Sequence, residues 1–415
     1  MSVRKTLVTL IYMVCCILMY FLHEGGFTIA GINFMYYYLL ALAGVIFAFG
    51  CFLVNPDVDR VLMTGRYVLI LAVPYLFSIF YSMMIWTLNL TSFRVMLRGF
   101  FQPSYQILAI CMSASAVYLF GEKGVYYQLA GLFVAYLLIF ARLIATGGGP
   151  GSFIQEYIRL IITRGQELGP IMERIEDMAY AHGMGFFILF LVFTWKENKY
   201  NFLFLVLALL FFMSGYKRSA LVGWLLAVLF FLFCRLAPKT IRKNVVILGG
   251  AILAAGGILY IWLLAADMVS VIFEKLGVDS MGRSEIYDAM RPYYEFTPTY
   301  PGKGLGYVNY SIGAGLINVG NQSRGDIHND LLRQYIEIGM IGYVIWLVMF
   351  FVWRLKALMK RTDVQMGMFA LMSFTYAFGC YATENMYYRF NTTLAFGAVL
   401  LSYAAQREKK SEEKS

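Results

Sequence analysis

The chain has 415 residues, of which 60% are hydrophobic and only 14% are charged, and its mean hydropathy is +0.67. Soluble globular domains are nearer half apolar and a quarter charged, so this composition excludes an ordinary soluble domain and predicts a polytopic membrane protein. The net charge is +10, and we expect membrane lipid and no nucleic acid among the partners. The six cysteines lie in or beside apolar stretches without metal-ligand spacing, so we interpret them as small hydrophobic residues.

The N-terminus joins a basic start at Arg4 and Lys5 to an apolar run and lacks a small-residue cleavage site. We therefore expect a retained first helix and no signal peptide. Further apolar stretches of spanning length predict an all-α, polytopic transmembrane helical bundle of about twelve helices. The expected spans are residues 5–22, 32–54, 66–88, 102–121, 124–146, 178–195, 200–215, 219–236, 244–266, 336–354, 364–386 and 390–405.

The predicted organisation has four parts. Residues 1–266 would hold helices one to nine, residues 267–335 a large extracytoplasmic loop before the third-last helix, residues 336–405 the last three helices and residues 406–415 a cytoplasmic tail. Orientation follows from lysine and arginine in short loops, which favour the cytoplasmic side. With both termini cytoplasmic, the inner segments hold 19 of the 34 basic residues in short stretches.

This orientation places two long segments outside, near 147–177 and at 267–335. In the first, Phe153, Tyr157, Leu160 and Ile161 recur at helical spacing and predict an amphipathic helix at the outer interface. The second is rich in aromatic residues and glycine turns and has no apolar run of spanning length, so we expect a compact cap of short helices. The outer segments also carry several arginines, which calls for an anionic partner or for structural ion pairs.

His328 is the most informative single residue, because it stands where this outer segment enters an apolar helix. Asp326 is a candidate cap of that helix, and the spacing of His328, Leu331, Leu332 and Tyr335 predicts one shared helix face toward the protein interior. A neutral imidazole in such a place can accept a proton near pH 7. The alternative is an ordinary surface histidine.

The pattern His328-Asn329, nine residues, Gly339, two residues and Gly342 resembles the signature of the O-antigen polymerase and O-antigen ligase superfamily. In that family the motif closes a large extracytoplasmic loop. Two glycines about one turn apart also allow a neighbouring helix to approach closely. Residues 214–231, with Ser214, Arg218, Leu221 and Gly223, and residues 281–308 resemble two further elements of the family.

The resemblance implies metal-independent glycosyl transfer on the outer face of the bacterial plasma (inner) membrane, without a cofactor. The donor would be an undecaprenyl-diphosphate-linked glycan, the acceptor another glycan, and other glycan-assembly proteins are further expected partners. His328 would act as base toward the acceptor hydroxyl, and Asn329 would orient the sugar or the imidazole. Arg218, Arg283 and Arg291 would bind the diphosphate, which suits the planar guanidinium. Snorkelling, or ion pairs with Glu285, Asp288 or Glu295, is the alternative for each arginine.

The expected activity is polymerisation of oligosaccharide repeat units for O-antigen, capsule or exopolysaccharide. Ligase-type transfer to another acceptor is a close alternative. A lipid-linked oligosaccharide flippase is an alternative of a different class, which the nearly charge-free helices disfavour.

Two further motifs have simpler interpretations. The stretch "PGKGLG" at 301–306 resembles a phosphate loop but lacks a preceding strand and a Gly-Lys-Ser/Thr end, so we interpret it as a turn, with Lys303 as a possible substrate contact. Asp57 and Asp59 have the spacing of a metal site, but capping of a helix by Asp57 or Asp59 is simpler. His23 and His182 have no partner pattern and are interpreted as structural. No metal site is expected.

Overall fold

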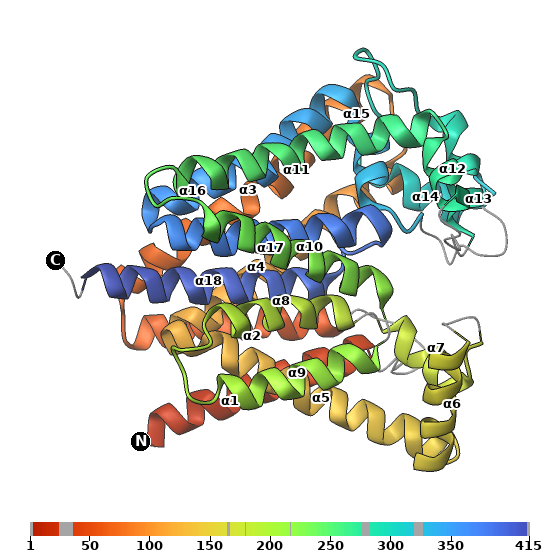
Figure 1. Cartoon of the computed structure of the whole chain (residues 1–415). Coiled ribbons are helices and arrows are strands. Elements are labelled where there is room, and N and C mark those ends of the chain that lie inside the picture. Colours follow the sequence, from red (N-terminus) through yellow and green to blue (C-terminus); the bar gives the residue numbers. More distant parts are fainter. Residues whose placement is uncertain are drawn as a thin grey trace. The chain divides into compact units, whose positions relative to one another are not determined.

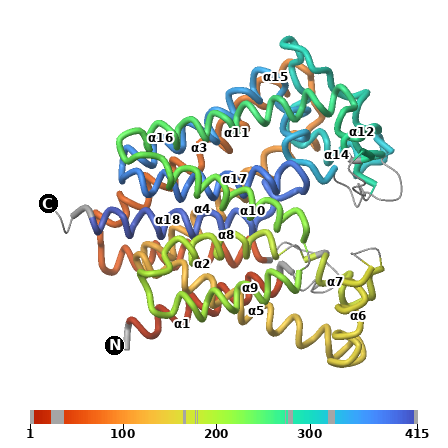
Figure 2. Tube along the Cα trace, in the orientation of Figure 1, coloured from red at the N-terminus to blue at the C-terminus, as the bar shows by residue number. Residues whose placement is uncertain are grey.

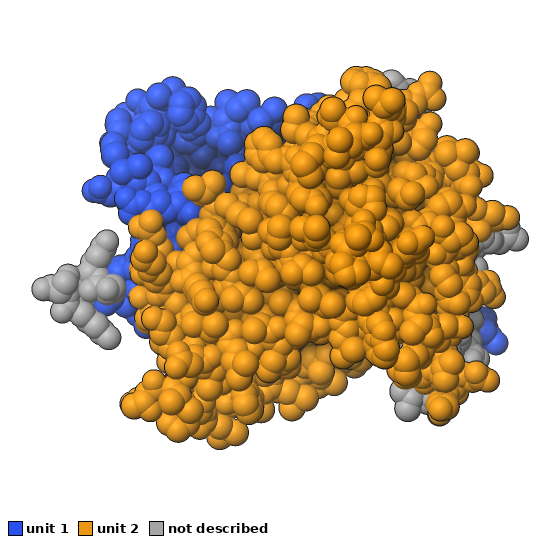
Figure 3. Space-filling view, turned by 90° about the horizontal axis from the view of Figure 1, so that it is seen from above, with its two compact units in different colours: residues 1–68, 108–218, 394–415 blue, residues 69–107, 219–393 orange. Residues whose placement is uncertain are grey.

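The computed structural model describes residues 3–24, 36–163, 167–178, 180–215, 217–275, 282–318 and 327–412. All regular secondary structure in these ranges is helical, as the composition predicts. The chain divides into two compact units, which are coloured separately in Figure 3. Unit 1 comprises residues 1–68, 108–218 and 394–415, and unit 2 comprises residues 69–107 and 219–393. Each unit is described by itself below.

Unit 1 is built around the packing of α1 against α2 and α5, and of α8 against α9. Gly131 on α5 lies against Cys16 on α1, where an added Cβ would come within 2.8 Å of the Cys16 Cβ, so the glycine lets the two helices approach closely. Its elements are α1 (Val3–Glu24), α2 (Tyr36–Val54), η1 (Gly121–Lys123), α5 (Gly124–Thr146), α6 (Pro150–Ile162), α7 (Pro170–Asp177), α8 (Tyr180–Phe193), α9 (Asn201–Ser214) and parts of α3 (Val58–Leu88), α4 (Phe93–Phe120) and α18 (Phe390–Glu412).

Unit 2 is organised around α11, which packs against α15, η3 and α17. Two glycines of α11 permit these contacts: an added Cβ at Gly250 would lie 2.3 Å from the Phe351 carbonyl oxygen, and one at Gly257 would lie 2.7 Å from the Leu347 side chain. Its elements are α10 (Arg218–Leu236), α11 (Arg242–Ala265), α12 (Met268–Lys275), α13 (Arg283–Met290), η2 (Arg291–Tyr293), α14 (Tyr307–Gly313), α15 (Asp330–Leu347), the π-helical η3 (Val348–Trp353), α16 (Arg354–Arg361), α17 (Val364–Thr383) and the remaining parts of α3, α4 and α18.

Several helices are long and apolar enough to cross a membrane, which supports a membrane protein. Among the described residues there are seven such candidates, and the bent pair of α7 and α8 would be an eighth. The prediction of about twelve spans is therefore supported only in its coarser, helical form, because α9 is shorter than a span and α17 and α18 are not among the candidates. The seven are Lys5–Leu22, Tyr37–Val54, Val58–Leu88, Phe93–Thr146, Arg218–Leu236, Arg242–Ala265 and Asp330–Arg361.

Within each unit, the segments predicted to face opposite sides of the membrane lie at opposite ends. In unit 1 the start of α1 and the end of α18 lie at one end of the helices, and α6 and α7 lie at the other (Figure 1 and Figure 2). In unit 2 the basic helix α16 lies at one end of α11, and α12, α13 and α14 lie at the other (Figure 1). The helices α12 to α14 lie within residues 267–335, the segment for which the sequence predicts a cap; the cap itself stays a prediction.

The amphipathic helix α6 differs in detail from its prediction. Leu160 is buried, but Ile161 is half exposed and belongs with the exposed Ile154 and Ile158 to a second apolar stripe. These three residues recur at helical spacing, so α6 presents apolar side chains outward as well as toward its own unit. This outward stripe, not the buried one, is the face that an interfacial helix would turn to lipid.

Candidate functional site

His328 lies immediately before α15, not on it. Its φ of 49° places the residue in the left-handed region, and its side chain is 36% exposed. Leu331, Leu332 and Tyr335 are fully buried. The prediction that His328 shares a helix face with these three residues is therefore wrong. The helix α15 begins only at Asp330, and His328 lies in the turn before it, where the left-handed backbone does not follow helical periodicity.

Glu384 is the partner of His328. The Nδ1 atom of His328 lies 3.3 Å from Oε2 of Glu384, whose side chain is only 10% exposed. The other carboxylate oxygen, Oε1, accepts a hydrogen bond of 2.6 Å from Nη2 of Arg283. One carboxylate in unit 2 thus joins two of the residues singled out from the sequence, the histidine and an arginine.

The sequence interpretation missed Glu384, although a signal for it was present. Glu384 is the residue immediately after α17, where its own extended backbone ends the helix. Glu384 is the only charged residue between positions 364 and 384 and falls within the span predicted at 364–386, and an ionisable residue inside a predicted span marks a functional candidate. Its role becomes visible only through its contacts with Arg283 and His328.

Asn329 holds the start of α15 in place. It is fully buried, and its side-chain oxygen caps the helix by accepting the backbone N–H of Leu332 at 2.9 Å. Its amide nitrogen donates to the Tyr260 hydroxyl at 2.8 Å, and that hydroxyl donates to the carbonyl of Ala382 at 2.7 Å. Asn329, not the Asp326 considered from the sequence, is therefore the cap; Asp326 lies outside the described residues.

Tyr287 on α13 lies against the same cluster. It is buried, and burial raises the pKa of its hydroxyl, although the positive charge of Arg283 acts in the opposite direction. Tyr287 is therefore a neutral phenol near pH 7 that can donate and accept hydrogen bonds beside Arg283 and Asn329.

The three arginines expected to bind diphosphate are placed differently. Arg283, the first residue of α13, contacts Glu384 and is one quarter exposed. Arg291 forms ion pairs with Asp267 at 2.6 Å and with Asp288 at 3.2 Å, and the hydrogen bond to Asp267 is the main cause that raises its pKa. The ion-pair alternative therefore describes Arg291. For Arg283 the acidic partner is Glu384 and none of the three acids considered from the sequence.

Arg218 is an exposed residue at the start of α10 and belongs to unit 1. Nearby in the sequence, Lys217 pairs with Glu176 at 3.0 Å, and the Ser214 hydroxyl lies 2.8 Å from that of Tyr180. The site assembled in unit 2 contains Arg283, His328 and Asn329. The role of Arg218 stays a prediction.

The two glycines of the motif have different roles. Gly339 breaks α15, with φ 68° and ψ 180°, and lies against the loop at 300–302. Backbone hydrogen bonds fill the break: the N–H of Lys303 donates to Ile336, that of Gly304 to Glu337 and that of Met340 to Tyr300. Gly342 instead faces the ring of Tyr81 on α3. The close approach predicted for Gly339 is therefore made by a loop and not by a helix.

The stretch "PGKGLG" is the loop that fills this break. Gly302, Gly304 and Gly306 all have φ near 85° and leave no room for a side chain. An added Cβ at Gly304 would come within 2.3 Å of the Trp86 ring, and one at Gly306 within 2.5 Å of the Val95 carbonyl oxygen. The turn interpretation is correct, since these glycines serve packing against α15, α3 and α4. Lys303 is half-buried.

Unit 2 also buries charges that sequence reasoning did not place inside. Arg333 and Glu337 on α15 are at most 1% exposed and form an ion pair at 3.5 Å. Arg354 is fully buried, donates to the Leu71 carbonyl and lies over the Phe350 ring at 4.2 Å. The expectation of nearly charge-free helices is therefore wrong for α15, so the charge content of the helices does not distinguish an enzyme from a flippase.

No metal site is found within the described ranges, where no group of three or more histidine, cysteine or acidic side chains could hold an ion. Asp57 accepts the backbone N–H of Arg60 at 3.0 Å at the start of α3, which is the capping role. His182 is buried in α8, and the side chain of His23 lies outside the described residues.

The geometry around Glu384 suits proton transfer beside a fixed positive charge. A carboxylate facing Nδ1 favours the tautomer with its proton on that nitrogen, which leaves the lone pair of Nε2 available to accept a proton. Arg283 places a permanent cation on the other oxygen of the same carboxylate.

No family model matches the chain, and no curated protein matches it.

Proposed function

We propose that the protein is a membrane glycosyltransferase that polymerises oligosaccharide repeat units carried on undecaprenyl diphosphate. The proposal includes about twelve transmembrane helices, an extracytoplasmic cap at 267–335 and cytoplasmic termini in the plasma membrane of a bacterium. One observation carries it: Glu384 contacts both Arg283 and His328, at 2.6 Å and 3.3 Å. A base and a cation, the two groups that such a transfer requires, therefore share one carboxylate.

In the proposed reaction the acceptor hydroxyl attacks the anomeric carbon of the donor sugar. The proton of that hydroxyl passes to Nε2 of His328, the bond from the anomeric carbon to the phosphate oxygen breaks, and the lipid diphosphate leaves with the electron pair. Glu384 holds the imidazole through Nδ1 and stabilises it once it is protonated. The remaining guanidinium donors of Arg283 stabilise the charge of the departing diphosphate.

The contacts of the other predicted residues refine their roles. The amide nitrogen and the amide oxygen of Asn329 both form hydrogen bonds within the fold, of 2.8 Å and 2.9 Å. Its proposed part is therefore to position His328 through the start of α15. Arg291 is held by two carboxylates and is a less suitable diphosphate ligand than Arg283. Arg218 keeps its proposed diphosphate role on the resemblance alone.

The test is a reaction of purified protein with a lipid-diphosphate-linked repeat unit, with the products resolved on a gel. A ladder of lengthening chains is expected. Transfer to a different lipid acceptor would identify a ligase, and movement of the lipid-linked unit across a vesicle membrane without new products would identify a flippase. Either result would replace the polymerase proposal.

Substitutions then test the residues. We expect His328→Ala and Arg283→Ala each to lower the turnover by at least about a hundredfold, which is typical for a general base or an electrostatic stabiliser. Arg94→Ala is the matched control, because Arg94 is an exposed arginine of unit 2 on α4. An undiminished rate of His328→Ala would eliminate the base assignment.

A further inference from the structure

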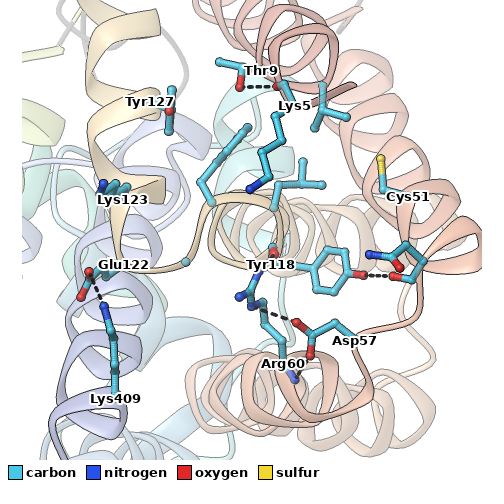
Figure 4. A pocket seen from close by; sticks show the side chains of 15 residues that line it. Lys5, Thr9, Cys51, Asp57, Arg60, Tyr118, Glu122, Lys123, Tyr127 and Lys409 are labelled. Atoms are coloured by element: carbon cyan, nitrogen blue, oxygen red, sulfur yellow. Dashed lines mark hydrogen bonds and ion pairs between the residues drawn. The ribbon is translucent and has the colours of Figure 1, made fainter. Parts of the chain in front are cut away.

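Unit 1 contains an open pocket that has no part in the proposed reaction. It has a volume of about 930 Å³ and lies where the ends of α1, α2, α3, α4 and α5 meet α18 (Figure 4). We call it the basic pocket. The charged residues that line it are Lys5, Asp57, Arg60, Glu122, Lys123 and Lys409.

The charges of the basic pocket do not balance. Asp57 pairs with Arg60 at 3.4 Å, and Glu122 pairs with Lys409 at 3.3 Å. Lys5 and Lys123 remain, and within the described parts of the chain their ammonium groups have no hydrogen-bond or ion-pair partner. Figure 4 shows the Lys5 side chain extending into the middle of the pocket. Two positive charges are therefore left for a ligand.

An apolar groove lies beside the basic pocket. It has a volume of about 240 Å³ and is lined by residues of α2, α3 and α4 that include Phe49, Phe52 and Gly65. Tyr118 borders both: its hydroxyl lies 3.5 Å from the Asn55 carbonyl oxygen at the charged end, and its ring contacts that of Phe52 on the apolar side. Unit 1 thus offers charged and apolar surface to the same ligand.

We propose that the basic pocket and the apolar groove bind a lipid whose headgroup ends in a phosphate. A phosphate monoester carries a charge of about −1.5 to −2 near neutral pH, which matches the two unpaired lysines. The pocket is large enough for a headgroup, since small-molecule sites commonly measure about 300–1,000 Å³. The apolar groove takes the first part of an acyl or prenyl chain, and Tyr118 marks the boundary between headgroup and chain.

The positions of the lysines fit a membrane-surface site. They come from segments predicted to be cytoplasmic: the N-terminus, the turn before α5 and the C-terminal helix. Basic pockets between helices at this level of a membrane bind anionic lipid headgroups. The pocket belongs to unit 1 and uses neither His328, Arg283 nor Glu384, so this proposal stands independently of the proposed reaction.

The first test compares lipids on the full-length protein. Binding of dioleoyl phosphatidic acid and of dioleoyl phosphatidylcholine is titrated by native mass spectrometry. We expect Lys5→Gln with Lys123→Gln to weaken phosphatidic acid binding about thirtyfold, because each lysine near a membrane surface contributes about a fivefold gain. Phosphatidylcholine binding should not change. The control, Lys196→Gln with Lys199→Gln, removes the same charge from exposed residues of unit 1 outside the pocket.

The second test concerns the chain. Gly65 lines the apolar groove, is exposed, and has no atom within 4 Å of the position that an added Cβ would take. The Cβ of Gly65→Phe therefore meets no neighbouring atom, its ring is placed to occupy the groove, and the substitution favours the helical state of α3. We expect it to weaken binding of long-chain phosphatidic acid at least tenfold and to leave the melting temperature unchanged or higher.

The results separate a lipid from a soluble phosphate. Selective binding of phosphatidic acid that depends on both the lysines and the open groove supports the proposal. Glycerol 3-phosphate or inorganic phosphate that binds as tightly as phosphatidic acid would overturn the lipid assignment. Equal loss of binding in the pocket variant and in its control, or no loss in either, would overturn the site.

Discussion

Gly339→Ala should destabilise the protein far more than its sequence neighbour Gly342→Ala. Gly339 has φ 68° and ψ 180°, a conformation that only glycine adopts readily and that costs other residues about 1–3 kcal/mol. The new Cβ would also lie 2.4 Å from the carbonyl carbon of Pro301 and 2.5 Å from the carbonyl oxygen of Tyr300. Both are backbone atoms, so no side-chain rotation can relieve the overlap.

The loop must therefore move, and the hydrogen bonds that fill the break in α15 are lost. There are three of them, between 2.7 Å and 3.0 Å long, and each contributes about 1 kcal/mol net. Together with the backbone strain, the expected loss of stability is about 4–6 kcal/mol. For Gly342→Ala the nearest atom is a side-chain carbon of Tyr81 at 2.6 Å, which can shift, and alanine gains helix propensity. A change within about 2 kcal/mol is expected there.

Both variants would be unfolded in detergent micelles with increasing SDS, and amide hydrogen exchange would be followed at Lys303, Gly304 and Met340. Gly339→Ala should unfold at a lower SDS fraction and lose protection at these three amides. Gly342→Ala should keep both properties near wild type. Equal stability of the two variants, with the amides still protected in Gly339→Ala, would refute the reasoning that Gly339 holds the loop in the break of α15.

Two further predictions concern Glu384 and Tyr294. Glu384→Gln should lower the rate of polymerisation about a hundredfold while the protein stays folded, because a neutral amide holds neither His328 nor Arg283 as the carboxylate does. Turnover and circular dichroism are the measurements. Full activity of the variant would exclude the role of Glu384. Burial raises the pKa of Tyr294 to about 12. The unfolded chain releases this proton near pH 10, so stability should fall as pH rises from about 10 to 12. Tyr294→Phe should flatten that part of the alkaline unfolding profile, and an unchanged profile would contradict the buried phenol.

Much of the helical architecture is predictable from the sequence. The span expected at 124–146 corresponds to α5 (Gly124–Thr146), and the span expected at 244–266 corresponds to α11 (Arg242–Ala265). These boundaries follow from local properties, since a long apolar run between basic or glycine-rich segments can satisfy its backbone in lipid only as a helix. The predicted number of about twelve spans is not borne out by helix length and composition, because α9 is shorter than a span and α17 and α18 are not among the candidate spans of the described residues.

The candidate site was predictable only in part. His328, Asn329 and Arg283 were identifiable from motif and residue type, but Glu384 is 56 residues from His328 and 101 from Arg283 along the chain. Contacts over such separations are produced by helix packing, which leaves no local pattern in the sequence. The same holds for Arg354, whose surroundings of aromatic rings and a backbone carbonyl come from other elements.

Composition and periodicity alone thus determined that this protein is helical and suited to a membrane, because burial of apolar surface and backbone hydrogen bonding are local requirements. The tertiary structure alone decided that Glu384 joins His328 to Arg283, that Gly339 is a break filled by a loop, and that Lys5 and Lys123 share one pocket. Each of these depends on distances between residues far apart in the chain, and only the packing of the helices within a unit sets those distances.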